Sequence, residues 1–111
     1  MLRSTKDFVA LQGASRRRAN PLLILRWRRN DQDRNRFGLS TGRRIGNAVV
    51  RNRVRRRLRD SLRRTDRRPD GGWDLLVVAR PASASASYEE LKTALDRLLD
   101  RMVKDEGDGP R

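Results

Sequence analysis

Residues 43–68 gather the side chains of this sequence that could bind phosphate. The stretch holds twelve arginines but only two aspartates, so most of its guanidinium groups have no acidic neighbour. A planar guanidinium can hold two phosphate oxygens at once and can also stack on a base. Arginine at this density therefore favours a nucleic-acid-binding surface. The alternative is a solvated helix face, on which exposed ion pairs contribute little.

Groups that could carry out catalysis in the protein itself are scarce. The sequence has no cysteine and no histidine, which removes disulfides, thiol nucleophiles, the usual zinc ligands and the commonest general base. Its carboxylates are scattered, without the paired and buried setting that prepares a carboxyl group for acid–base work. We therefore predict no catalytic residue and no metal ligand in this chain.

The charge of the whole chain also indicates a polyanionic partner. There are 28 Lys and Arg residues against 14 Asp and Glu, a net charge of +14. Residues 71–111 carry six basic and eight acidic side chains, so the partner surface is expected in the first two thirds. The N-terminus has no apolar segment of signal-peptide length, and the apolar runs are too short to span a bilayer. We expect a cytoplasmic protein with no membrane partner.

A helix from Ala48 to about Arg64 must hold most of these arginines. Asn47 is a suitable N-cap for it, and the segment contains no glycine or proline. Two stripes recur at every fourth residue, so each follows one side of the helix. The apolar stripe is Val50, Val54, Leu58 and Leu62, and the charged stripe is Arg51, Arg55, Arg59 and Arg63. The helix is thus expected both to pack on the core and to bind the partner.

Strands are predicted on both sides of this helix, over residues 22–27, 36–40 and 73–79. The last is nearly continuous in apolar character, so it is expected at the centre of the sheet. A short helix is predicted near residues 4–12. A closing amphipathic helix follows a capping box of Ser87 and Glu90, after a low-complexity loop over residues 82–87.

This order of elements predicts an α+β sandwich, with helices packed on a small and mostly antiparallel sheet. The length of 111 residues suits one hydrophobic core. We expect a single RNA-binding domain over residues 1–104 and a disordered C-terminal tail over residues 105–111.

Residues 37–59 resemble the signature of the bacterial ribonuclease P protein family. They read FGLSTGRRIGNAVVRNRVRRRLR, with Arg51-Asn52-Arg53 as the core of the signature. Basic residues stand on both sides of that core at the family's spacing: Arg43, Arg44, Arg55, Arg56 and Arg59. The resemblance extends over roughly residues 2–102, with residues 28–36 and the C-terminal tail unmatched. One departure is Gln12, where the family often has a second aromatic residue four positions after Phe8.

The resemblance implies a two-layer αβββαβα sandwich with a four-stranded sheet, including a very short strand near residues 14–18. In the family the signature helix crosses over between two parallel strands in the left-handed sense, which is a rare exception among such connections. Members of the family are the RNA-binding, non-catalytic protein subunit of an endoribonuclease whose active site lies in a catalytic RNA. That enzyme removes the 5′ leader of precursor tRNA.

The resemblance also implies roles for residues of this chain. The RNA-binding group would be Arg43, Arg44, Asn47, Arg51, Asn52, Arg53, Arg55, Arg56 and Arg59. A cleft for the single-stranded leader, between the first helix and the sheet, would be formed by Phe8, Phe37, Arg55 and Arg59. From the residues alone, Phe8 and Phe37 are better explained as core.

The implied partners are the catalytic RNA and the 5′ leader of precursor tRNA, not DNA. The implied cofactor is Mg²⁺, bound mainly by the RNA, which would hydrolyse the phosphodiester bond. The protein would supply substrate affinity and screen phosphate repulsion, and so broaden the substrate range and lower the magnesium requirement.

Three other classes of protein fit part of this pattern. A structural ribosomal protein would share the size, the basicity and the RNA partner but not this signature. A helix-turn-helix DNA regulator needs two helices joined by a short turn, whereas an apparent strand and a glycine-bounded connection precede the arginine-rich helix. A nuclease acting alone is disfavoured by the missing histidine and the lack of a clustered acidic metal site.

Overall fold

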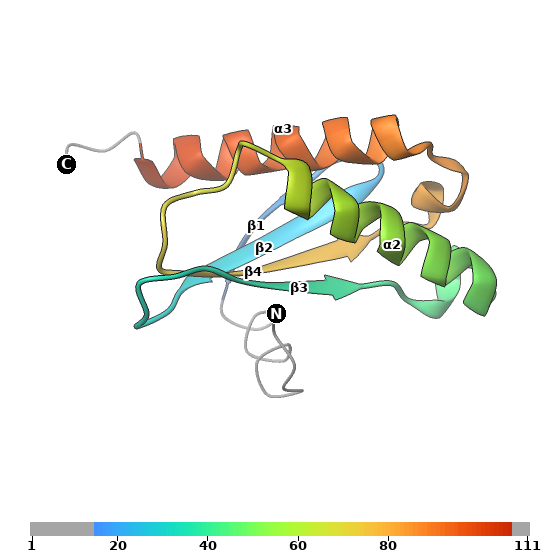
Figure 1. The fold of residues 1–111 in the computed structure, drawn as a ribbon, viewed down its shortest axis with the longest axis horizontal. Helices are drawn as coiled ribbons and strands as arrows, with labels where there is room; N and C mark the ends of the chain where they lie inside the picture. Colours follow the sequence, from blue (N-terminus) through green and yellow to red (C-terminus); the bar gives the residue numbers. More distant parts are fainter. Residues whose placement is uncertain (1–14, 108–111) are drawn as a thin grey trace.

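The computed structural model describes residues 15–107 and shows two layers, a four-stranded sheet with two long helices on one of its faces (Figure 1). The strands are β1 (Arg16–Ala19), β2 (Leu23–Arg29), β3 (Arg36–Ser40) and β4 (Trp73–Ala79). The helices are α2 (Ala48–Arg64), α3 (Tyr88–Gly107) and the short 3-10 helices η1 (Arg43–Ile45) and η2 (Pro81–Ser85). The helix predicted at residues 4–12, including Phe8, lies outside the described residues.

The strands lie in the order β1-β2-β4-β3. Strand β2 pairs antiparallel with β1 and β4, whereas β3 pairs parallel with β4, and α2 forms the connection between β3 and β4. The predicted α+β sandwich is therefore confirmed, and the short strand expected near residues 14–18 is β1. The left-handed sense of the crossover stays a prediction.

Alternation along β2 and β4 divides the sheet into two faces. The apolar side chains that face α2 and α3 are buried and pair across the two strands: Leu23, Leu25 and Trp27 with Ala79, Val77 and Leu75. Successive side chains of a strand point to opposite faces, so Arg26 and Arg28 lie on the other side, called the back face below. The predicted central place of β4 is confirmed, and its Asp74 and Leu76 are fully buried as well.

Helix α2 begins and packs as its sequence predicts. The Asn47 side chain accepts a hydrogen bond of 3.0 Å from the backbone N–H of Val50, which satisfies one of the free donors at the helix start. On the apolar stripe, Val54, Leu58 and Leu62 are buried in the core, and Val50 packs against it. The arginines of α2 are thereby held at the surface.

Helix α3 begins at the predicted capping box. The Ser87 hydroxyl accepts from the Glu90 backbone N–H at 3.1 Å, and the Glu90 carboxylate accepts from the Ser87 backbone N–H at 2.9 Å. Its core-facing side includes Leu91, Leu95 and Met102, which are fully buried. The segment over residues 82–87, predicted as a loop, is organised in part as η2.

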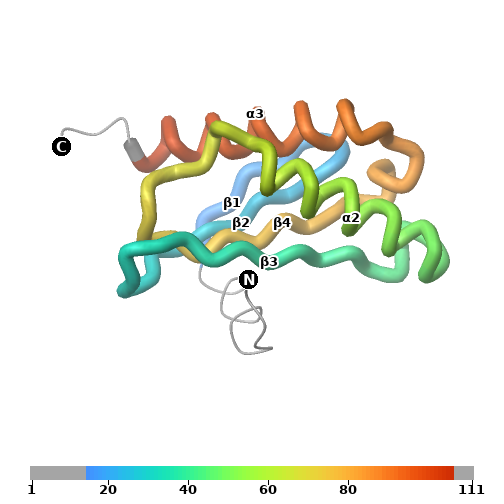
Figure 2. The backbone as a smooth tube through the Cα atoms, in the orientation of Figure 1, coloured from blue at the N-terminus to red at the C-terminus, as the bar shows by residue number. Residues whose placement is uncertain are grey.

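The predicted start of the C-terminal tail at residue 105 is wrong, because α3 continues to Gly107. Asp105 accepts two hydrogen bonds from Arg18, at 2.7 and 2.8 Å, and Glu106 accepts one from the Trp27 indole at 2.9 Å. These contacts join the end of α3 to β1 and β2. The colours of Figure 2 show that α3 (red) and these two strands (blue) are far apart in the sequence. Local polarity predicted fraying, whereas pairing with distant arginine and tryptophan side chains extends the helix.

Gly71 permits a close approach between the loop before β4 and the loop after β2. A Cβ atom at Gly71 would lie 2.0 Å from the carbonyl oxygen of Asp33, so the backbone would have to move. We expect Gly71→Ala to lower the free energy of unfolding by about 1–3 kcal/mol in urea denaturation. In the control Gly42→Ala the new Cβ meets nothing within 4 Å, and we expect a change below about 0.5 kcal/mol. Equal effects of the two substitutions would contradict this prediction.

Candidate nucleic-acid interface

The nine residues predicted to bind RNA all lie on α2, at its N-cap or on η1 immediately before it. Helix η1 is anchored by Ile45, which is buried in the core, so Arg43 and Arg44 are presented at the start of α2. The core stripe then fixes the rotation of α2. The structure therefore brings these residues onto one continuous segment, and most of their side chains are exposed.

Two of the predicted arginines, Arg51 and Arg55, are only partly exposed. Arg55 donates to the Thr41 hydroxyl at 2.8 Å and to the Asn52 side-chain oxygen at 3.3 Å. The Nε of Arg51 is buried and has no hydrogen-bond partner. Within residues 15–107, none of the arginines predicted to bind RNA forms an ion pair with a carboxylate. Their charge is thus not neutralised by the described part of the protein.

Arg53 lies on the other flank of α2 from Arg51 and Arg55, because two residues span about 200° of a helix. Its guanidinium donates to the backbone carbonyl of Ala84 at 2.9 Å. Arg57, which was not predicted as a site residue, donates to the carbonyl of Ala86 at 2.6 Å. Arg53 and Arg57 therefore tie α2 to the segment between β4 and α3. The RNA-binding role predicted for Arg53 remains a prediction.

Acidic side chains gather on α3 and neutralise other parts of the chain. Asp100 pairs with Arg67 at 3.1 Å, and Asp96 pairs with Lys92 at 2.9 Å. Near the end of the helix, Glu106 pairs with Arg16 at 2.9 Å. The carboxylates of α3 thus pair with basic side chains on β1, on α3 itself and in the loop after α2, whereas the outer side of α2 stays basic.

The back face of the sheet carries a second group of arginines that the site prediction did not include. Strand pairing sets Arg17 of β1 opposite Arg26 of β2, and places Arg28 of β2 and Arg36 of β3 on either side of Asp74 of β4. We call Arg17, Arg26, Arg28 and Arg36 the back-face arginines. For two of them the sequence carries a signal in the alternation of β2, because Arg26 and Arg28 fall on the opposite face from Trp27.

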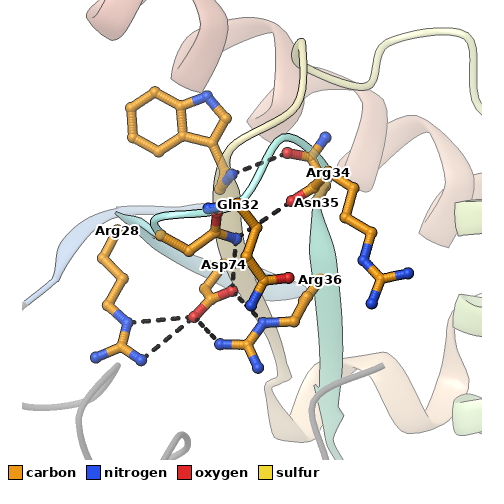
Figure 3. Close-up of polar contacts among 8 residues, drawn as sticks. Arg28, Gln32, Arg34, Asn35, Arg36 and Asp74 are labelled. Carbon is orange, nitrogen blue, oxygen red and sulfur yellow. Dashed lines mark hydrogen bonds and ion pairs between the residues drawn. The ribbon is translucent and has the colours of Figure 1, made fainter.

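Asp74 is the centre of a polar cluster on the back face (Figure 3). It is 0% exposed and accepts hydrogen bonds from Arg36 at 2.8 and 2.7 Å, from Arg28 at 3.4 and 3.2 Å, and from Asn30 at 2.9 Å. Burial alone would raise the pKa of Asp74. The hydrogen bonds and charges of its partners outweigh burial and hold this pKa below its ordinary value of 3.8.

The depressed pKa of Asp74 predicts a loss of stability in acid. The ionised carboxylate stabilises the fold at pH values above its unfolded-state pKa, and this contribution disappears as the pH falls through the lower folded-state pKa. We expect the free energy of unfolding of Asp74→Asn to lie below that of the unchanged protein at neutral pH. The two curves should converge as the pH falls below about 4, because Asp74 itself becomes protonated in the unchanged protein and the other carboxylates titrate alike in both proteins. A constant difference across this range would contradict the prediction.

Phe37 lies on the helix-facing side of the sheet, opposite to the back face. It pairs with Leu75, packs against the core, and has the Arg68 guanidinium 5.5 Å above its ring centroid. This position fits the core role that the residues alone favoured. Arg55 and Arg59, also predicted for the leader cleft, lie on α2. The structure does not bring Phe37, Arg55 and Arg59 together with the back-face arginines.

Over residues 15–107, no group of three or more acidic, histidine or cysteine side chains could hold a metal ion. No helix in the same range is long and apolar enough to cross a bilayer.

The fold and these surfaces define a small, strongly basic α+β sandwich with arginines on a helix and on the opposite sheet face. Comparison with known proteins gives the family. Residues 1–103 match the family model described as Ribonuclease P. The ribonuclease P protein component of Alkaliphilus oremlandii is 35% identical over 101 residues, which covers 91% of this chain and 89% of that protein. The chain belongs to the ribonuclease P protein family.

Solved structures of the family have the same fold. The RNase P protein from Thermotoga maritima is 27% identical and superposes with a TM-score of 0.82, covering 90% of this chain and 94% of that one. The Staphylococcus aureus RNase P protein is 22% identical, with a TM-score of 0.81 over 91% of this chain and 93% of that one, a likeness of fold. The predicted family and sandwich architecture are confirmed.

Proposed function

We propose that this chain is the protein subunit of ribonuclease P and binds the catalytic RNA through α2. The observation that carries this proposal is the surface of α2 itself. Its predicted RNA-binding arginines are presented by a helix anchored in the core, and no described carboxylate pairs with them. Phosphate oxygens of an RNA would supply the missing counter-charge, and release of condensed cations would favour binding.

We also propose that the back face receives the single-stranded 5′ leader of precursor tRNA. The family's leader cleft includes a sheet face, and α2 and α3 cover the other face of this sheet. The back face also carries partly exposed apolar side chains, such as those of Ile24 and Val78, which are paired across β2 and β4. A cationic surface with apolar patches suits single-stranded RNA without demanding a particular base sequence.

In this proposal the chemistry belongs to the RNA. The protein contributes positive charge and leader affinity, and magnesium ions held mainly by the catalytic RNA would supply the chemistry of phosphodiester hydrolysis. The protein therefore lowers the magnesium requirement and broadens the range of precursors, in the cytoplasm. It binds no DNA in this role.

The test is cleavage of 5′-labelled precursor tRNA at low magnesium by a bacterial ribonuclease P RNA, with and without this protein. We expect mature 5′ ends only when both components are present, and none with the protein alone. An Arg56→Ala, Arg59→Ala variant should lose most of the effect. A protein that binds the RNA but never changes cleavage would overturn the proposal in favour of a general RNA-binding or ribosomal role.

A further inference from the structure

We propose that Asp74 is a positioning residue that holds Arg28 and Arg36 as a fixed pair of phosphate-binding groups for the leader. This inference rests on the proposed binding of the leader at the back face. It adds a residue that does not touch RNA itself. The carboxylate acts through the two arginines on the neighbouring strands.

The Asp74 side chain is more deeply buried than those of Arg28 and Arg36, as expected for a residue that acts through the two arginines. The Asp74 side chain is 0% exposed, whereas those of Arg28 and Arg36 are 29% and 27% exposed. An RNA strand on the back face would therefore meet the guanidinium groups and not the carboxylate. The negative charge lies beneath the cations, where it orients them without repelling the phosphates directly.

The sheet register makes the arrangement rigid. Arg28, Asp74 and Arg36 are direct neighbours on β2, β4 and β3, so they form a row across three hydrogen-bonded strands. Asp74 accepts from Arg36 through two parallel hydrogen bonds, the geometry that fixes a guanidinium plane. A long arginine side chain that is already ordered loses less conformational entropy when it binds phosphate.

The carboxylate is itself held in place. Asn30 donates to one Asp74 oxygen at 2.9 Å, and its own side-chain oxygen accepts from the Gln32 backbone N–H at 2.9 Å. The turn that begins the β2–β3 loop thus fixes Asn30, and Asn30 helps to fix Asp74. Arg28 and Arg36 then take their direction from the backbone of the sheet and the loop (Figure 3).

Removal of the Asp74 charge distinguishes a positioning role for Asp74 from simple electrostatic attraction between the protein and RNA. The substitution Asp74→Asn makes the protein more positive, so electrostatics alone predicts tighter binding of every RNA. Positioning predicts the opposite result for the leader. An amide has one oxygen acceptor, so it cannot hold Arg36 through two parallel bonds and also keep Arg28.

The experiment measures Kd for precursor tRNA bound to the reconstituted holoenzyme, with a long leader and with a leader trimmed to one nucleotide. The ratio of the two values is the leader contribution. For the unchanged protein we expect a clear preference for the long leader. For Asp74→Asn we expect this contribution to fall about five- to tenfold, with unchanged affinity for the catalytic RNA.

The matched control is Asp100→Asn, which removes the carboxylate that pairs with Arg67 on the far side of the fold. It should leave the leader contribution unchanged. An Asp74→Asn protein that retains the full leader contribution, binds all RNAs more tightly, or loses short and long precursors equally would overturn the positioning role. If the unchanged protein shows no leader preference, the proposed leader site itself fails.

A second variant covers the case in which Asp74→Asn does not fold. Arg36→Lys keeps the positive charge and leaves Asp74 with a cationic partner, but an ammonium group cannot form the two parallel bonds. We expect it to lose leader contribution as well, by about threefold or more. If Arg36→Lys keeps the full leader affinity, the two parallel hydrogen bonds between Arg36 and Asp74 are not needed for leader binding, and the proposal is overturned.

Discussion

Reversing two charges on α2, in an Arg56→Glu, Arg59→Glu variant, should weaken binding of the catalytic RNA by about 100-fold at moderate salt. Both side chains are exposed on the outer side of the helix, and neither forms an ion pair with a described residue. The change removes two phosphate contacts and adds repulsion. The dependence of log K on log salt should become shallower by about two, which filter binding over a salt series would measure.

The control for this prediction carries the same change in net charge on another surface. Arg97→Glu, Arg101→Glu places the two reversals on exposed positions of α3, a helix that bears six of the 14 acidic residues. We expect a loss of affinity below about fivefold from the altered overall charge, with an unchanged salt slope. Equal losses in the two variants would mean that the net charge, and not the surface of α2, determines RNA binding.

Removing the central core contact of α2 should have the largest effect on stability. Leu58 is fully buried in the hydrophobic core, so Leu58→Ala leaves a cavity that the closely packed surroundings cannot fill. We expect the free energy of unfolding to fall by about 3 kcal/mol in urea denaturation. RNA affinity should fall with it, because the packing of Leu58 fixes the orientation of the arginines.

Val49 provides the matched control on the same helix. Its side chain is 73% exposed, so Val49→Ala removes apolar atoms that are not packed. The free energy of unfolding should stay within about 0.5 kcal/mol or rise slightly, because alanine favours the helix. A loss below about 1 kcal/mol for Leu58→Ala would show that α2 is not anchored by this stripe.

The two proposed surfaces lie on opposite sides of one thin sheet. Helix α2 covers the core-facing side near β3, and the back-face arginines project from β1, β2 and β3 on the other side. Strand β2 serves both sides, since Trp27 packs in the core while Arg26 and Arg28 face away. In the proposed function, the catalytic RNA therefore binds on the α2 side of the sheet and the leader binds on its back face.

Local and periodic features of the chain could be predicted from its sequence. The repeat of Val50, Val54, Leu58 and Leu62 predicts the buried side of α2, since residues four apart share a helix side. Asn47 and the Ser87–Glu90 box predict the helix starts because capping involves residues three positions apart. Alternation in β2 predicts its two faces. The lack of cysteine and histidine, and the family signature, were equally visible in the sequence.

Pairings between residues far apart in the sequence could not be predicted, because they depend on the tertiary structure. Asp74 lies 46 positions from Arg28 and 38 from Arg36, and it meets both because β4 is placed between β2 and β3. Asp105 belongs to α3 and not to a tail because Arg18 lies beside it, 87 positions away in the sequence. Strand order and register depend on the packing of the whole chain, so a local pattern of residue types does not contain these partners.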